Sequence, residues 1–300
     1  MSAPQNVIEL GAARAAARAA RDFSLADKIR DQIADLGYEI LDLPDGFDFR
    51  AKARFPVVAR ITDVKALTET QFDAVFVMVV DSFAADARLS LQNIKKNAVG
   101  NFAIQVLISG TPDTEPLLAE LDGQTFLVQV TEGAGWGESI NALIKIATAP
   151  IVIVMDPSTQ LTGDALTPVI DALNKKEFSA VGWRGGLVNL VDDWRTTEDK
   201  GPGEVDVLFS YFMALDRAET LEAGAFNIRA RYYRNADIEF SLRLRQAHGR
   251  LLQMELPLIQ ARHHGYYDAD PEFRETESKK NYDRILDRFR GKNEILSPRR

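Results

Sequence analysis

Phe72-Asp-Ala-Val-Phe-Val-Met-Val-Val80 is an almost continuous apolar stretch of strand length. A run without polar alternation is typical of a strand buried on both faces, as in a parallel sheet. Strand and helix patterns then alternate along the chain. Strands are expected over Phe102–Ser109, Thr125–Val130 and Ile151–Met155, and helices over Ala84–Lys96, Ser139–Ala147, Ala218–Ala223, Ala236–Ala247 and Glu275–Arg288. This alternation predicts an α/β fold with a mostly parallel sheet flanked by helices.

A smaller unit precedes the predicted sheet. The segment Asn6–Ala20 is rich in alanine and favours a helix. In the next segment apolar residues recur at helical spacing, namely Leu25, Ile29, Ile33 and Leu36. We expect the two helices to pack as a hairpin. The chain is thus divided into a helical hairpin over residues 1–54, a linker over 55–71 and an α/β domain over 72–300.

Composition excludes several classes of protein. A net charge of −8 over 300 residues gives no overall attraction to nucleic acid or anionic membranes. The absence of cysteine excludes disulfides and thiolate metal sites. No apolar run reaches the roughly 20 residues needed to cross a bilayer, and the alternating alanines and arginines of Gly11–Arg21 do not form a secretory signal. We expect a cytoplasmic protein, with a peripheral position at the inner face of the membrane as a second option.

Three segments occur in an order that resembles family 2 glycosyltransferases, whose GT-A fold is Rossmann-like. They are Gly135-Trp-Gly-Glu-Ser-Ile-Asn141 with Ile151-Val-Ile-Val-Met-Asp156-Pro-Ser158-Thr159, then Asp206–Phe226, then Asn235-Ala-Asp237-Ile-Glu239-Phe-Ser-Leu-Arg243. The resemblance spans roughly residues 72–290 and implies transfer of a sugar from a nucleotide-diphospho-sugar to a hydroxyl group. Asp206–Phe226 is similar to the strand and helix on the acceptor side.

Asp156 falls where the family places a metal-binding carboxylate, and Ser158 stands where a second aspartate is frequent. A nucleoside diphosphate leaves easily only when its charge is neutralised. Carboxylates at the carboxyl end of a strand suit Mg²⁺ or Mn²⁺, and open α/β sheets bind ligands at that edge. Asp156 is therefore the expected anchor of Mg²⁺ or Mn²⁺. The alternative is a polar turn after a buried strand.

Asp237 falls on the position of the family's catalytic base. Inverting transfer needs one base that activates the acceptor hydroxyl opposite the departing nucleotide. The alternative is that Asp237 caps a helix on which Glu239 and Arg243 form a surface pair. We expect Asp237 to be catalytic because it follows the Asp156 segment in the family's order.

Donor binding is expected from a wider set of residues. Asp81 follows the first strand, where the family usually has a loop that holds the base, and Ser109 ends the next strand, where an aspartate often contacts the nucleotide. Asn141 lies in the matching helix. The expected donor-binding residues are Asp81, Ser109, Asn141, Asp156 and Ser158. These departures from the family's pattern leave the identity of the donor open.

His263 and His264 follow a predicted strand, at a place where the resemblance implies a histidine in the metal shell. Imidazole suits Mn²⁺ as an additional ligand. Adjacent side chains of a strand point to opposite faces, so at most one of the two can face the site, and His263 is the first choice. A structural role is the alternative.

The segment Ala12–Arg50 resembles the small C-terminal helical piece of bacterial cysteinyl-tRNA synthetases. The resemblance rests on Ala19-Ala-Arg-Asp22-Phe23-Ser-Leu-Ala26-Asp27-Lys-Ile29-Arg30-Asp31 and Leu41-Asp42-Leu-Pro44-Asp-Gly46-Phe-Asp-Phe-Arg50. It implies contacts with tRNA phosphates through arginines. The alternative is a docking or oligomerisation module that binds a protein or a second copy of the chain.

The leading hypothesis is an inverting glycosyltransferase that uses a nucleotide-sugar donor and a hydroxyl acceptor on a polysaccharide, a lipid-linked glycan or a protein. A non-catalytic sugar-nucleotide-binding or tRNA-binding protein on the same fold is the alternative.

Overall fold

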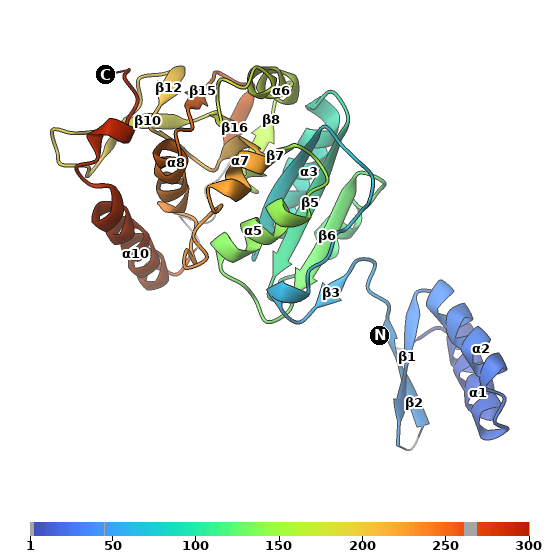
Figure 1. Ribbon diagram of the computed structural model, residues 1–300. Coiled ribbons are helices and arrows are strands. Elements are labelled where there is room, and N and C mark those ends of the chain that lie inside the picture. The colour runs from blue at the N-terminus through green and yellow to red at the C-terminus, as the bar shows by residue number, and fades with distance from the viewer. Residues whose placement is uncertain (1–2, 45, 261–268, 300) are drawn as a thin grey trace. The chain divides into compact units, whose positions relative to one another are not determined.

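The structure, a computed structural model, describes residues 3–44, 46–260 and 269–299 (Figure 1). The chain forms two compact units, Met1–Pro56 and Val57–Arg300. Among the described residues, no helix is both long enough and apolar enough to span a bilayer.

The first unit combines two helices with a β-hairpin. Its elements are α1 (Gln5–Ala19), α2 (Phe23–Asp35), β1 (Tyr38–Leu43) and β2 (Gly46–Ala51). The expected helical hairpin is present, and Ile29 and Ile33 are buried against Val7 of α1. Leu25 and Leu36, expected on the same buried face, are instead 46% and 45% exposed. Leu25 lies in the first turn of α2 and Leu36 directly follows its last residue, so both lie at the ends of the face that Ile29 and Ile33 bury.

An ion pair ties α1 to the β-hairpin. Arg14 is 7% exposed and donates to both carboxylate oxygens of Asp42, at 2.6 and 3.1 Å. Arg18 contacts the same carboxylate. The hydrogen bond from Arg14 holds the pKa of Asp42 at about 2. These arginines are therefore engaged within the unit rather than free for phosphate.

The second unit is built on a nine-stranded sheet with the order β12-β15-β9-β14-β7-β4-β5-β6-β3. Neighbouring strands from β7 to β3 run parallel, whereas β14 runs antiparallel between β7 and β9. The strands are β3 (Val57–Val58), β4 (Ala74–Val80), β5 (Phe102–Ser109), β6 (Thr125–Val130), β7 (Ile151–Met155), β9 (Ala180–Gly182), β12 (Gly203–Val205), β14 (Phe212–Asp216) and β15 (Leu251–Gln253). The predicted mostly parallel α/β sheet is confirmed.

Helices flank this sheet, and the predicted helical regions are present. They are α3 (Ala84–Asn97), α4 (Glu115–Leu118), α5 (Trp136–Ile146), α6 (Leu166–Asn174), α7 (Arg217–Glu222), α8 (Ala236–Gln246) and α10 (Pro271–Phe289), with short 3-10 turns η1 (Ile61–Asp63) and η2 (Asn293–Ile295). Two small sheets complete the unit, from β8 (Thr159–Leu161) with β16 (Leu258–Gln260), and from β10 (Gly185–Val188) with β11 (Thr197–Glu198) and β13 (Val207–Leu208). The segment 57–71, expected to lie in a linker, supplies β3 and η1.

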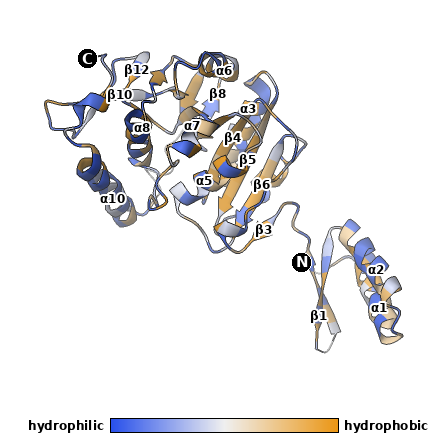
Figure 2. Ribbon diagram, viewed as in Figure 1, coloured by the Kyte–Doolittle hydropathy of each residue, from blue (hydrophilic) through white to orange (hydrophobic). Residues whose placement is uncertain are grey.

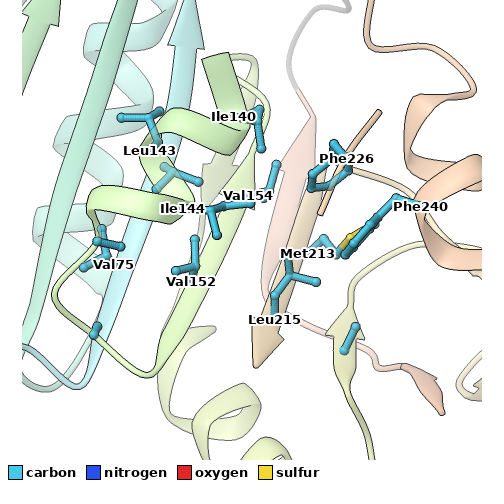
Figure 3. Close-up of a cluster of buried hydrophobic side chains, with 14 of the residues drawn as sticks. Val75, Ile140, Leu143, Ile144, Val152, Val154, Met213, Leu215, Phe226 and Phe240 are labelled. Atoms are coloured by element: carbon cyan, nitrogen blue, oxygen red, sulfur yellow. The ribbon is translucent and has the colours of Figure 1, made fainter. Parts of the chain in front are cut away.

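One hydrophobic core cluster lies between the sheet and α5. Figure 2 shows the central strands as the most hydrophobic part of the unit. Ile140, Leu143 and Ile144 of α5 pack on Val75 and Val152 of the sheet (Figure 3). On the same cluster Phe226 stacks on Phe240 of α8, with ring centroids 4.2 Å apart. This cluster joins α8 to the central strands and so fixes the start of that helix.

Gln105 is a polar exception inside this core. It lies in β5, is fully buried, and neither atom of its amide has a hydrogen-bond partner. Burying an unpaired amide costs about 1–3 kcal/mol. Gln105→Met, which keeps the volume, should therefore stabilise the protein by about 1–3 kcal/mol and raise the Tm by about 2 °C or more.

Gln129→Met is the matched control on the next strand. The amide of Gln129 donates to the carbonyl oxygen of Gly110 at 2.8 Å, so the same replacement should lower the Tm there. Calorimetry of both variants checks the pair. A loss of stability in Gln105→Met would contradict the prediction and point to a water molecule bonded to the amide.

Candidate active site

A cavity of about 700 Å³ lies at the carboxyl ends of the parallel strands. Asp81 directly follows β4, Ser109 ends β5, and Asp156 directly follows β7, and all three line the cavity. They meet because β4 lies between β5 and β7, and the carboxyl ends of parallel strands share one edge. This edge is where open α/β sheets bind ligands.

Asp156 is partly buried and held in one orientation. Its Oδ1 accepts hydrogen bonds from the main-chain N of Ser158, at 2.8 Å, and from the Ser158 hydroxyl. Its own N donates to the carbonyl oxygen of Tyr211 at 3.2 Å. Within the described part of the chain, no hydrogen bond reaches Oδ2. That oxygen is therefore the one available to a ligand.

Ser158 orients Asp156 instead of lining the cavity. It is 1% exposed, and its hydroxyl donates to Asp156 and accepts from Nε2 of Gln260 at 3.3 Å. Because the hydroxyl is buried and already has two hydrogen-bond partners, it cannot contact a sugar-nucleotide donor in the cavity. The direct donor contact expected of Ser158 is replaced by a positioning role.

Asn141 also has a structural role. Its Nδ2 donates to the carbonyl oxygen of Phe226 at 2.8 Å, and its Oδ1 accepts from the N of the same residue at 2.9 Å. Both the oxygen and the nitrogen of the Asn141 amide are thus hydrogen-bonded to Phe226, and Asn141 does not line the cavity. The predicted donor contact is replaced by a clamp that holds Phe226 against α5.

Ser109 and Asp81 remain at the cavity. Oγ of Ser109 accepts from the N of Ala134 at 2.9 Å and donates to the carbonyl oxygen of Ala134 at 3.1 Å, so it fixes the loop before α5. Asp81 is exposed and accepts from the hydroxyl of Ser82 at 2.9 Å. Asp81 is therefore the freer of the two for a ligand.

Main-chain contacts bring the segment Ala230–Tyr233 to the start of α5. The N of Gly137 donates to the carbonyl oxygen of Ala230 at 2.8 Å, and the N of Trp136 donates to that of Arg231 at 3.2 Å. A Cβ on Gly137 would lie 2.2 Å from the carbonyl oxygen of Asn227. Glycine is thus required for this close approach, which forms one wall of the cavity.

Gly137→Ala should push this segment away from α5. We expect a loss of about 1–3 kcal/mol of stability, as for other overpacked sites, together with weaker binding of any ligand in the cavity. Thermal unfolding and ligand titration measure the two effects. Gly123→Ala is the control, because the new methyl group would have no atom within 4 Å, and it should change neither quantity.

Tyr232 and Tyr233 line the cavity but were not identified from the sequence. Their rings lie 4.6 Å apart, and Tyr232 also packs edge-on against Phe273 of α10 at 6.0 Å. Burial, followed by the neighbouring phenol, raises the pKa of Tyr233. Both phenols therefore stay neutral. The available signal was an aromatic pair just before an acidic helix start.

Asp237 lies in the first turn of α8, is 5% exposed, and lines neither this cavity nor the groove described below. Its Oδ2 accepts from the N and Oγ of Ser210, at 2.9 and 3.2 Å, and its Oδ1 accepts from the N of Ile238 at 2.9 Å. Burial raises its pKa to about 6, and these hydrogen bonds limit the rise. Such a carboxylate can exchange a proton near neutral pH.

Tyr211 connects the two predicted carboxylates. Burial, followed by the negative charges of Asp237 and Asp156, raises its pKa to about 12. The carbonyl oxygen of Tyr211 accepts from the N of Asp156 at 3.2 Å, and Asp237 accepts from the N of Ser210, the residue before Tyr211, at 2.9 Å. The expected pair of acidic groups is brought together here, around an aromatic residue that the sequence pattern did not single out.

The metal shell is partly outside the described residues. His263 and His264 both lie in 261–268, so their predicted role is not addressed by the structure. Among residues 3–44, 46–260 and 269–299, no three acidic, histidine or cysteine side chains gather as a metal-binding group.

The sequence model described as glycosyl transferase family 2 matches residues 85–236, just over half of the chain. The chain belongs to glycosyl transferase family 2. The match contains Asp156 and ends one residue before Asp237. It does not reach the first unit.

Two solved structures resemble this family 2 chain, and both contain Mn²⁺. GalNAc-T7 with UDP, GalNAc and Mn²⁺ has a TM-score of 0.56 at 14% identity, over 73% of this chain and 48% of its own. The mannosyltransferase PcManGT from Pyrobaculum calidifontis, with GDP-Man and Mn²⁺, has a TM-score of 0.57 at 17% identity, over 75% of this chain and 67% of its own. The chain thus spans about half of the first structure. At these identities the similarity supports the expected GT-A fold.

No curated protein matches the sequence of this family 2 chain significantly. Neither the family match nor the two structures support the expected likeness of residues 12–50 to cysteinyl-tRNA synthetases. That likeness rests on the sequence pattern alone.

Proposed function

We propose that this family 2 chain transfers a sugar from a nucleotide-diphospho-sugar to a hydroxyl group with inversion at the anomeric carbon. The observation that carries the proposal is the placement of two aspartates beside Tyr211: the N of Asp156 donates to the carbonyl oxygen of Tyr211, and Asp237 accepts from the N of Ser210, the preceding residue. Asp156 lines the cavity at the sheet edge, where its carboxylate suits a cation that neutralises an anionic leaving group. Asp237 is buried with a raised pKa of about 6, which suits a proton acceptor.

The cavity fits a divalent cation held jointly by the protein and a diphosphate. Mg²⁺ is usually bound through one or two carboxylates plus substrate phosphates, so Asp156 with its open Oδ2 meets this pattern. His263 and His264 stay candidates for the rest of the shell. When bound, Mg²⁺ or Mn²⁺ neutralises charge on the diphosphate leaving group. Ser158 contributes by holding Asp156 in place.

Donor recognition is assigned to the remaining cavity walls. The exposed carboxylate of Asp81 is free to accept hydrogen bonds from a nucleobase or ribose. Ser109 shapes the loop that faces it, and Tyr232 and Tyr233 supply an aromatic wall. Pockets of this kind, mostly apolar with a few polar groups, orient ligands of nucleotide size.

Asp237 is assigned as the base that takes the proton of the acceptor hydroxyl. A general base works best when its pKa lies near the operating pH, and burial places Asp237 there. The Ser210 hydrogen bonds keep the carboxylate in one orientation. The acceptor itself is a hydroxyl of a polysaccharide, a lipid-linked glycan or a protein.

A non-catalytic sugar-nucleotide-binding protein is the second candidate. It is favoured by one observation, that Asp237 lines neither cavity and is 5% exposed. The first unit has a separate assignment, as a module for docking a protein, a second copy of the chain or tRNA.

A donor screen by thermal shift tests the proposal. UDP-, GDP- and dTDP-sugars are each added with and without Mn²⁺. A donor at about 100 times its Kd should stabilise the fold by about 2.7 kcal/mol. We expect at least one donor to raise the Tm only when Mn²⁺ is present, and to be slowly hydrolysed. Binding without any hydrolysis or transfer favours the non-catalytic candidate, and no binding across the panel contradicts both.

A further inference from the structure

A second hollow, the acceptor groove, lies beside Tyr211 and has a volume of about 510 Å³. Trp183 and Arg184 directly follow β9, and Phe209 and Tyr211 precede β14, the neighbouring strand. Gln260 at the end of β16 completes this part of the wall. The groove is thus built from the antiparallel side of the sheet, separate from the residues that line the first cavity.

Residues that line the acceptor groove are bonded to Asp156, which lines the first cavity. The carbonyl oxygen of Tyr211 accepts from the N of Asp156 at 3.2 Å, so a groove residue and a cavity residue share a main-chain hydrogen bond. On the other side, Gln260 reaches Asp156 through the Ser158 hydroxyl. Two binding spaces whose walls are joined at one residue suit transfer between two substrates held side by side.

Aromatic rings and one guanidinium give the acceptor groove its chemistry. The ring centroids of Phe209 and Tyr211 lie 6.0 Å apart. The guanidinium carbon of Arg184 lies 4.5 Å from the ring centroid of Trp183, a cation–π contact that holds the planar group in place. In the described residues, no carboxylate forms an ion pair with Arg184. An exposed, pre-oriented guanidinium of this kind matches a carboxylate in a two-pronged hydrogen bond.

The acidic side chain of the acceptor groove is already engaged. Oδ1 of Asp199 accepts from the N of Gly201 at 2.7 Å and from Nε2 of Gln253 at 3.2 Å. Asp199 is thus held by these two neutral donors, and among the described residues it forms no ion pair with Arg184. Its remaining oxygen suits a neutral hydroxyl, and the apolar faces of the aromatic rings suit the C–H face of a pyranose.

We propose that the acceptor groove takes an acidic saccharide, with a pyranose ring against the aromatic residues and a carboxylate on Arg184. This inference rests on the proposed function, because it names the class of acceptor. A uronic acid supplies both features in one residue. A phosphorylated sugar offers an anion as well, and the experiment separates the two.

The test measures binding of three probes to the full chain without donor, by isothermal titration and by saturation-transfer NMR. The probes are trigalacturonate, the matched neutral galactotriose, and the same neutral trisaccharide carrying one phosphate. We expect trigalacturonate to bind at least tenfold more tightly than the neutral probe. Arg184→Gln should remove this preference and leave the neutral affinity within about twofold, while Arg184→Lys keeps part of it.

Further variants separate the role of the ring from that of the charge. Trp183→Ala should weaken both the acidic and the neutral trisaccharide, and Trp183→Phe should restore much of the loss. Arg229→Gln is the control, because Arg229 is exposed and lines neither space. It should change no affinity. Circular dichroism of each variant confirms that the fold is intact.

Equal affinity for the acidic and neutral probes, or a preference that survives Arg184→Gln, overturns the proposal. A preference for the phosphorylated probe alone contradicts the assignment of a uronic acid, while the groove remains a site for an anionic sugar. Because no donor is present, the outcome is independent of the donor screen. A preference for the acidic saccharide without any donor binding would contradict only the transferase proposal. Donor binding without a preference for the acidic saccharide would contradict only the assignment of the groove.

Discussion

Asp237→Asn should reduce sugar transfer by about 10²–10⁴-fold, the range that a positioned base contributes. Asparagine keeps the size of the side chain and an oxygen that accepts from Ser210, so the geometry of the α8 start is retained. What is lost is the ability to take a proton. The drop should therefore appear in kcat, with the donor Kd nearly unchanged. Steady-state kinetics and donor titration measure the two quantities.

The same carboxylate predicts the pH dependence of transfer. Burial raises the pKa of Asp237 from 3.8 to about 6. The base is therefore protonated below about pH 6, and kcat should fall about tenfold per pH unit there. The pH dependence of folding stability has the opposite direction to that of kcat. A proton binds the folded state more tightly, so the contribution of this group to stability is present below pH 3.8 and is lost as the pH rises through 6.

Asp164→Asn is the matched control for the helix-cap alternative. Asp164 accepts from the N atoms of Leu166 and Thr167, at 3.0 and 3.2 Å, at the start of α6 and away from the site. Losing part of this cap should lower stability and leave kcat and its pH profile unchanged. If Asp237→Asn behaves in the same way, the base assignment fails and the capping interpretation takes its place.

Asp156→Asn should remove the metal-dependent part of donor binding. An amide oxygen is a weaker ligand for Mg²⁺ or Mn²⁺ than a carboxylate, and Lewis-acid stabilisation is worth several kcal/mol. We expect a decrease of about 10²-fold or more in kcat/KM and loss of the Mn²⁺-dependent rise in Tm with donor. Titration of Mn²⁺ against a fixed donor concentration gives the affinity directly.

The control for this variant is Asp113→Asn. Asp113 lies in the loop after β5, as Asp156 lies after β7, and it accepts from the N of Glu115 at 3.0 Å, but it does not line the first cavity. Its replacement should leave the Mn²⁺ effect intact. An unchanged Mn²⁺ effect in Asp156→Asn as well would place the cation elsewhere, with His263 and His264 as the next residues to replace.

The strands that form the candidate site were predictable because their signal is local. The runs that became β4, β5 and β7 are apolar over nearly their whole length, and a strand buried on both faces leaves this mark in any sequence. Asp81 and Asp156 were predicted as site residues from the resemblance to family 2 glycosyltransferases, and both line the cavity because each directly follows such a strand. The fold class and the edge of the sheet followed from the alternation of strands and helices.

The role of Asn141 was not predictable, because it depends on Phe226, 85 residues later. Ser158 bonds to Asp156 two residues away, but its burial and its second partner, Gln260, come from a segment 102 residues later. No local sequence pattern identifies Tyr211 as a residue of the site. It matters only because β14 pairs antiparallel beside β7 and brings this residue next to Asp156.

By itself, the sequence determined the α/β architecture and the helical hairpin, because hydrophobic periodicity is a local property of the chain. The catalytic and metal-binding roles of Asp237 and Asp156 stay predictions that rest on the family resemblance. Only the tertiary structure decided which side chains line the cavity and which polar groups are already hydrogen-bonded within the protein. It also decided that burial raises the pKa of Asp237 to about 6. Exposure and desolvation depend on contacts between distant segments, and no short stretch of sequence carries them.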